Sequence, residues 1–110
     1  MSEPRRTITL RSERSEKDWR NLWAFTDDEG NLHIDGQDLG PGTDPVSPDG
    51  EYEWFETIQA VDIPRLIELL GGEPGSDPLD ILQERWSGSR SYELERLLEN
   101  SEINLSRSVY

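Results

Sequence analysis

The spacing of apolar residues changes once along this chain, close to residue 62. Before that point apolar and polar residues alternate, as at Leu32, His33 and Ile34, which is typical of half-buried β-strands. After it apolar residues recur every three or four positions, which is typical of helices with one apolar face. Because the strands precede the helices and do not alternate with them, the chain is expected to form an α+β fold with an antiparallel sheet.

Five segments have the pattern of strands, at residues 6–12, 19–26, 31–35, 51–61 and 103–110. Between the second and third stands the sequence Asp-Asp-Glu-Gly at 27–30, which favours a tight hairpin turn. The sheet is therefore expected to have four to five strands, with two or three helices from the C-terminal half packed on one face.

Helix starts are indicated by residues that cap the first turn. Asp62 precedes a segment with Pro64 in its first turn, and Asp77 stands directly before Pro78. Ser91 is expected to cap a third helix.

The length of 110 residues indicates a single domain spanning 1–110. Residues 1–5 are expected to be disordered, and residues 36–50, rich in glycine and proline, are expected to form a long loop. Loops of this length in a small domain are often functional.

Acidic residues are concentrated in one block of the chain. Residues 21–64 contain eleven Asp and Glu and neither Lys nor Arg, and they account for -11 of the net charge of -13. Such a field repels nucleic acid and anionic membranes and attracts a basic partner. The other interpretation of the block is a solvated surface that serves only solubility.

The candidate partner-binding residues come from this block and from one neighbouring aromatic residue. They are Asp27, Asp28, Glu29, Asp35, Gln37, Asp38, Glu51, Glu53 and Trp23. Trp19, Trp23 and Phe25 would share one strand face, which forms an exposed aromatic platform if Leu22 faces the core. Most of the four tryptophans are expected in the core, Trp54 and Trp86 above all.

The sequence offers little to catalysis or to metal binding, and we predict no enzymatic activity, no cofactor and no metal site. Cysteine is absent, and His33, the only histidine, is expected to point from a strand into solvent. Asp27, Glu29 and Asn31 have the spacing that opens a calcium loop, but Leu32 stands where such a loop requires glycine. No signal peptide or membrane span is visible, so a cytoplasmic location is expected.

Several segments resemble a group of small acidic bacterial proteins, chiefly actinobacterial, that are usually called hypothetical. The segments are DWRNLW, GNLHIDGQDLGPG, EYEW, DIPRLIELLGG and DPLDILQERW. The likeness spans residues 18–86, and the run Gly36-Gln37-Asp38-Leu39-Gly40 is its most distinctive part. The resemblance implies no particular activity, but it makes the loop around Gln37 and Asp38 the candidate for a shared site.

Size and acidity are also similar to those of immunity proteins that neutralise toxins, a likeness of type and not of motif. The hypothesis from sequence is a non-catalytic acidic protein that inhibits a basic partner, such as a toxin. Two alternatives stay open: a nucleic-acid mimic that blocks a DNA-binding or defence enzyme, and a binder of a small ligand beneath the loop at 36–50. The oligomeric state is left undetermined.

Overall fold

A computed structural model describes residues 6–15, 18–39, 51–103 and 105–109 of the chain. The strands are β1 (Thr7–Arg14), β2 (Trp19–Thr26), β3 (Leu32–Leu39), β4 (Glu51–Ile58) and β5 (Leu105–Val109). The helices are a 3-10 turn η1 (Ala60–Asp62), α1 (Ile63–Leu69), α2 (Pro78–Arg85) and α3 (Arg90–Glu99). The α+β prediction is confirmed.

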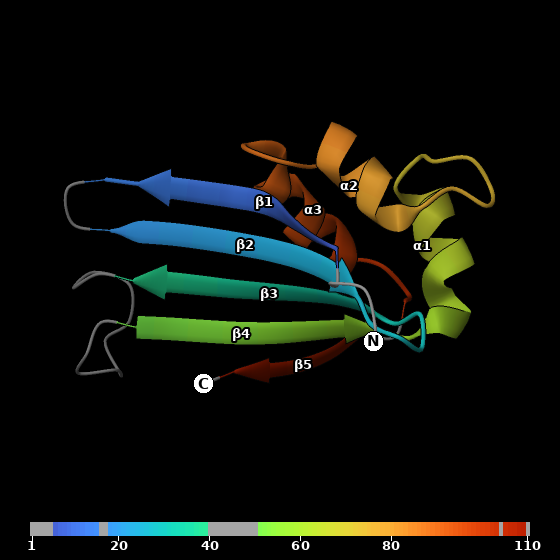
Figure 1. Cartoon of the computed structure of the whole chain (residues 1–110), viewed down its shortest axis with the longest axis horizontal. Helices are drawn as coiled ribbons and strands as arrows, with labels where there is room; N and C mark the ends of the chain where they lie inside the picture. The colour runs from blue at the N-terminus through green and yellow to red at the C-terminus, as the bar shows by residue number, and fades with distance from the viewer. Residues whose placement is uncertain (1–5, 16–17, 40–50, 104, 110) are drawn as a thin grey trace.

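The five strands form one antiparallel sheet in which neighbours in space are also neighbours in the chain, in the order β1-β2-β3-β4-β5. Figure 1 shows α3 behind this sheet, α2 along the edge formed by β1, and α1 at one end of the strands. The helices therefore gather on one face and one end of the sheet, and the other face remains without a helix over the described residues.

The core lies between the sheet and the helices. It is formed by Ile8, Leu10, Leu22, Ala24, Leu32, Ile34, Trp54 and Ile58 from the strands and by Leu66, Ile67, Leu70, Leu79, Ile81, Leu82, Leu94 and Leu98 from the helical half. The strand members alternate with residues that face away, so the pleat separates a buried face from an open one.

Gly36 marks the closest approach inside this core. It lies between Leu22 and Trp54 in the register, and a Cβ atom added to it would come within 2.1 Å of the Trp54 ring. The indole of Trp54 therefore lies over the backbone of β3, and only glycine leaves room for it. The predicted loop at 36–50 was wrong at its start, because residues 36–39 belong to β3. Its remainder lies outside the described residues, as do residues 1–5.

Other predicted boundaries also differ from the structure, and β5 begins at Leu105 instead of residue 103. β1 extends to Arg14, and β4 ends at Ile58, where the chain turns into η1. The helix expected to start at Ser91 is capped at Ser89 instead. The predicted starts at Asp62 and Asp77 are confirmed, although only Asp77 accepts a capping bond from its side chain, from Leu79 N at 2.9 Å.

Ser91 has a different role because an arginine reaches it from the sheet. A register shift in β1 between Thr9 and Arg11 brings two consecutive side chains, Leu10 and Arg11, into the interior. Arg11 Nε donates to Ser91 Oγ at 2.8 Å, its guanidinium pairs with Glu95, and it lies 3.6 Å from the centre of the Tyr92 ring. This buried arginine fixes α3 against β1.

The contact between Gly36 and Trp54 leads to a test of stability. Gly36→Ala is expected to lower the free energy of unfolding by about 1 to 3 kcal/mol, because the added methyl group overlaps the indole. Urea denaturation measures this change. In a Trp54→Leu background, which removes the overlapping ring, the same substitution should cost clearly less, and equal costs in the two backgrounds would contradict the account.

Candidate functional site: the open face of the sheet

The face of the sheet that points away from the helices carries the candidate site, which we call the open face. The strand register arranges its side chains in rows that run across β2, β3 and β4. One row holds Trp23, Asp35 and Phe55, and the next holds Phe25, His33 and Thr57. A third holds Asn21, Gln37 and Glu53. The open face is therefore both aromatic and acidic.

Asp35 occupies the middle of this face, on the central strand of the five. Trp23 and Phe55 stand directly opposite it on the neighbouring strands, where side chains are about 5 Å apart at Cβ. Partial burial raises the pKa of the Asp35 carboxyl, and the nearby His33 lowers it by a smaller amount. The site thus holds a carboxylate that is poorly hydrated for its charge.

The row beside it is organised around His33. Its ring stacks on Phe25, with the ring centres 4.8 Å apart and the planes at 13°. Its Nδ1 lies 3.2 Å from Thr57 Oγ1 and its Nε2 lies 2.8 Å from Asp27 Oδ2. The expectation that His33 points freely into solvent was wrong, because the side chain is only 25% exposed and both of its nitrogens have partners.

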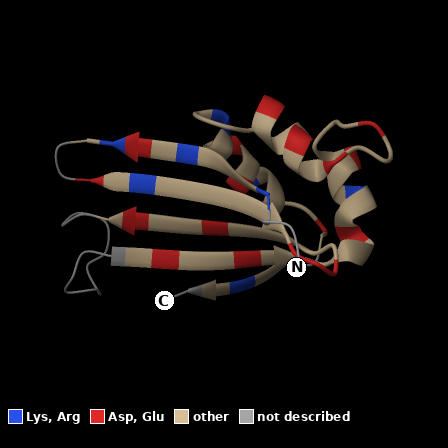
Figure 2. Ribbon diagram, viewed as in Figure 1, with Lys and Arg blue, Asp and Glu red and all other residues tan. Residues whose placement is uncertain are grey.

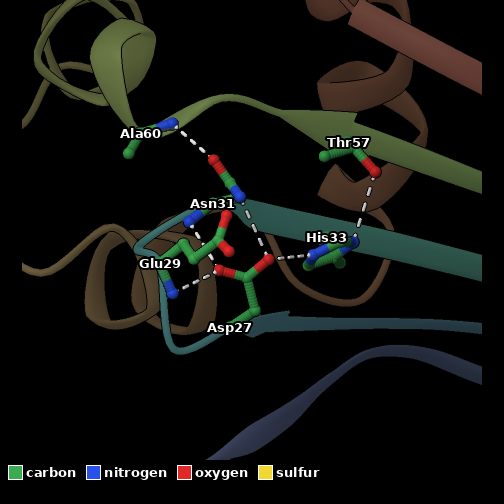
Figure 3. Close-up of polar contacts among 6 residues, drawn as sticks. All are labelled: Asp27, Glu29, Asn31, His33, Thr57 and Ala60. Carbon is green, nitrogen blue, oxygen red and sulfur yellow. Dashed lines mark hydrogen bonds and ion pairs between the residues drawn. The ribbon is translucent and has the colours of Figure 1, made fainter.

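Asp27 receives four polar contacts at the end of the β2–β3 hairpin (Figure 3). Its Oδ1 accepts from the backbone N–H groups of Glu29 at 2.9 Å and Asn31 at 3.0 Å. Its Oδ2 accepts from Asn31 Nδ2 at 3.1 Å and from His33 Nε2. These donors, His33 first among them, hold the pKa of Asp27 well below its usual range.

Asn31 extends this cluster to the next strand connection. Its Oδ1 accepts from the backbone N–H of Ala60 at 2.9 Å, just beyond the end of β4 (Figure 3). Thr57, His33 and Asp27 form a continuous series of hydroxyl, imidazole and carboxylate. At Thr57 the backbone is paired with β3 and with β5, so this part of β4 offers no spare N–H donors for an oxyanion. The contacts of Thr57, His33 and Asp27 are therefore best explained as stabilising the β2–β3 hairpin.

The structure brings together some of the residues predicted to bind a partner and separates others. Trp23, Asp35, Gln37 and Glu53 share the open face, where Gln37 Nε2 donates to Glu53 Oε1 at 3.2 Å. Asp27, Asp28 and Glu29 lie at the hairpin end of the same sheet. Glu51 begins β4, opposite Leu39 in the register.

Asp38 does not belong to this surface. It is paired with Arg20 and Tyr52, on the face of the sheet that carries the helices. Burial raises its pKa, and the charges of Arg20 and Arg11 oppose that rise. Gln37 and Asp38 therefore do not share one surface, because consecutive residues of a strand point to opposite faces.

The tryptophans divide between the two faces. Trp54 is 4% exposed in the core, and Trp86 packs partly buried against that core. Trp19 is 42% exposed and Trp23 is partly exposed on the open face, so with Leu22 in the core the aromatic platform is present. Arg14 lies over the Trp19 ring, 5.6 Å from its centre.

Charge differs from strand to strand across the sheet (Figure 2). Acidic positions mark β3, β4 and the turn between β2 and β3, whereas arginines lie on β1, which also carries Glu13, at the start of β2 and on β5. The acidic positions of β3 and β4 are divided between the faces, with Asp35 and Glu53 on the open face and Asp38 and Glu56 on the face that carries the helices.

The contacts of Asp27 in the β2–β3 hairpin predict how the stability of the protein changes with pH. In an unfolded chain the pKa of an aspartate is about 3.9. Because folding lowers the pKa of Asp27, its contribution is complete above that value and is lost as the pH falls further. Asp27→Asn should therefore lower Tm at pH 7 and reduce the fall in Tm between about pH 4 and 2.

Asp28→Asn is the matched control, since Asp28 is the exposed neighbour in the same turn. Thermal unfolding followed by circular dichroism across this pH range measures both variants. If Asp27→Asn and the wild type lose Tm in parallel as the pH falls, the proposed role of the carboxylate is refuted.

Comparison with known proteins gives no further guide to the site. No protein family, curated protein or solved structure matches the chain. None of the helices in the described ranges is long and apolar enough to cross a membrane. Those ranges also contain no group of three or more metal-ligating side chains.

Proposed function

We propose that this protein is a non-catalytic binding protein whose open face docks a basic segment of a partner protein. The observation that carries the proposal is the row of Trp23, Asp35 and Phe55, a carboxylate between two aromatic residues on a sheet face that no described helix covers. Tryptophan is enriched among the few residues that contribute most of the binding energy in protein interfaces, and carboxylates select a positively charged partner.

The distribution of charge supports the sign of the partner. Asp35 and Glu53 lie on this face, Asp27 lies at its hairpin end, and the net charge of -13 extends the field beyond direct contact. Such a field accelerates the encounter with a basic protein and weakens as salt is added. Glu53 adds charge on the same face, and the exposed residues Asp28 and Glu29 add charge at the β2–β3 turn.

An inhibitor or immunity protein is the most concrete form of this function. In that form the open face covers the basic active-site surface of a toxin and blocks access of its substrate. A cytoplasmic location and the absence of catalysis are parts of the same proposal. The aromatic row favours a protein partner over mimicry of nucleic acid, because a mimic needs carboxylates spaced like phosphates and has no use for a central aromatic row.

The test compares two pairs of substitutions that remove the same charge from different faces. Asp35→Asn with Glu53→Gln alters the open face, and Glu68→Gln with Glu84→Gln alters exposed positions on α1 and α2. The immobilised protein is incubated with lysate of the source organism at low salt and eluted with a salt gradient. A basic protein identified by mass spectrometry should bind about tenfold more weakly to the first pair.

The second pair should retain the affinity of the wild type to within about threefold, because its charges lie away from the interface. An equal loss of affinity for the two pairs would contradict the proposed interface, because it would show that only the overall negative charge matters. Displacement of the captured protein by DNA at matched ionic strength would instead favour the nucleic-acid mimic.

A further inference from the structure

The Asp35 carboxylate lacks a partner within the chain. Among the residues that the structure describes, none donates a side-chain hydrogen bond to it or forms an ion pair with it. Two other acids of this region differ in this respect. Asp27 accepts four contacts, and Glu56 lies 4.0 Å from Arg107.

This lack of a partner has a cost in the free protein. A partly buried carboxylate is stabilised only when a positive charge or hydrogen-bond donors replace the water it has lost. Desolvation is the first cause of the raised pKa of Asp35, and the opposing effect of His33 is the smaller of the two. A carboxyl whose pKa is raised on folding makes the folded state less stable at pH 7 than below that pKa. A cation supplied by a partner would remove this cost.

We infer that Asp35, with Trp23 and Phe55 on either side, is the subsite for one arginine side chain of the partner. The inference rests on the proposed function and names the group that this face receives. A planar guanidinium stacks on an aromatic ring while its edge donates two parallel hydrogen bonds to a carboxylate. A row with a carboxylate between two aromatic residues offers both kinds of contact.

The surroundings of the row favour arginine over lysine. On one side lie Phe25 and His33, stacked on each other, and on the other side lie Gln37 and Glu53, joined by a hydrogen bond. A flat group of the size of guanidinium can lie along this ridge of rings and amides. An ammonium is more strongly hydrated and gains less from the aromatic contact.

The test uses short peptides, because they report on the subsite without the rest of the partner. Acetyl-Gly-Gly-Xaa-Gly-Gly-amide is prepared with arginine, lysine or citrulline at the central position and titrated into the isotope-labelled protein. The arginine peptide should shift the indole N–H signal of Trp23 and the backbone amide signals of Asp35 and Phe55. It should bind at least about threefold more tightly than the lysine peptide, and the citrulline peptide, which has no charge, should not bind.

Asp35→Asn should weaken binding of the arginine peptide by about tenfold or more, and Glu84→Gln should leave this binding unchanged. The Tm of Asp35→Asn at pH 7 should equal or exceed that of the wild type, because an unpaired carboxylate is removed. Loss of binding in this variant therefore does not reflect unfolding.

The inference is overturned if the wild type does not bind the arginine peptide, if lysine binds equally well, or if Asp35→Asn binds as the wild type does. Each of these results leaves the proposed function standing as long as the captured basic protein still binds more weakly to Asp35→Asn with Glu53→Gln than to Glu68→Gln with Glu84→Gln. Binding of the arginine peptide without any captured protein would support the subsite and count against the proposed function.

Discussion

The contact of Trp54 with Gly36 is the constraint on which both faces of the sheet depend. It fills the centre of the core with the largest side chain available, at the one position on β3 where no side chain competes for the space. Because side chains alternate along a strand, a register fixed on the buried face is fixed on the open face as well. The same pairing that seats Trp54 against Gly36 therefore aligns Asp35 with Phe55.

Local sequence determines the parts of the fold that were predicted well. The turn after Asp27 and the start of α2 at Pro78 depend on residues within a few positions of each other. Gly36 and Ser91 were misread because their roles depend on distant partners. Gly36 has the sequence context of a loop but lies within β3, where the Trp54 ring packs over it. Ser91 has the context of a helix cap but accepts a hydrogen bond from the buried Arg11.

The candidate site was predicted in part for the same reason. Alternation along one strand is visible in the sequence, so Trp23 was correctly separated from Leu22. The adjacency of Asp35 to Trp23 and Phe55 depends on the register between strands, which composition and spacing do not reveal. The contact between Asp27 and His33 was also missed, although a single histidine close to an acidic turn could have indicated it.

The order of the strands also sets the route by which the chain reaches this structure. β2 and β3 meet across a short turn, so their pairing closes a small loop at low entropic cost. β5 pairs with Trp54 to Ile58 only after the chain has passed through α1, α2 and α3. That ladder closes the longest loop in the sheet, and we expect it to form late in folding, once the helices have shortened the distance. This pairing fixes both ends of the helical segment, because the strand before it and the strand after it are joined to each other.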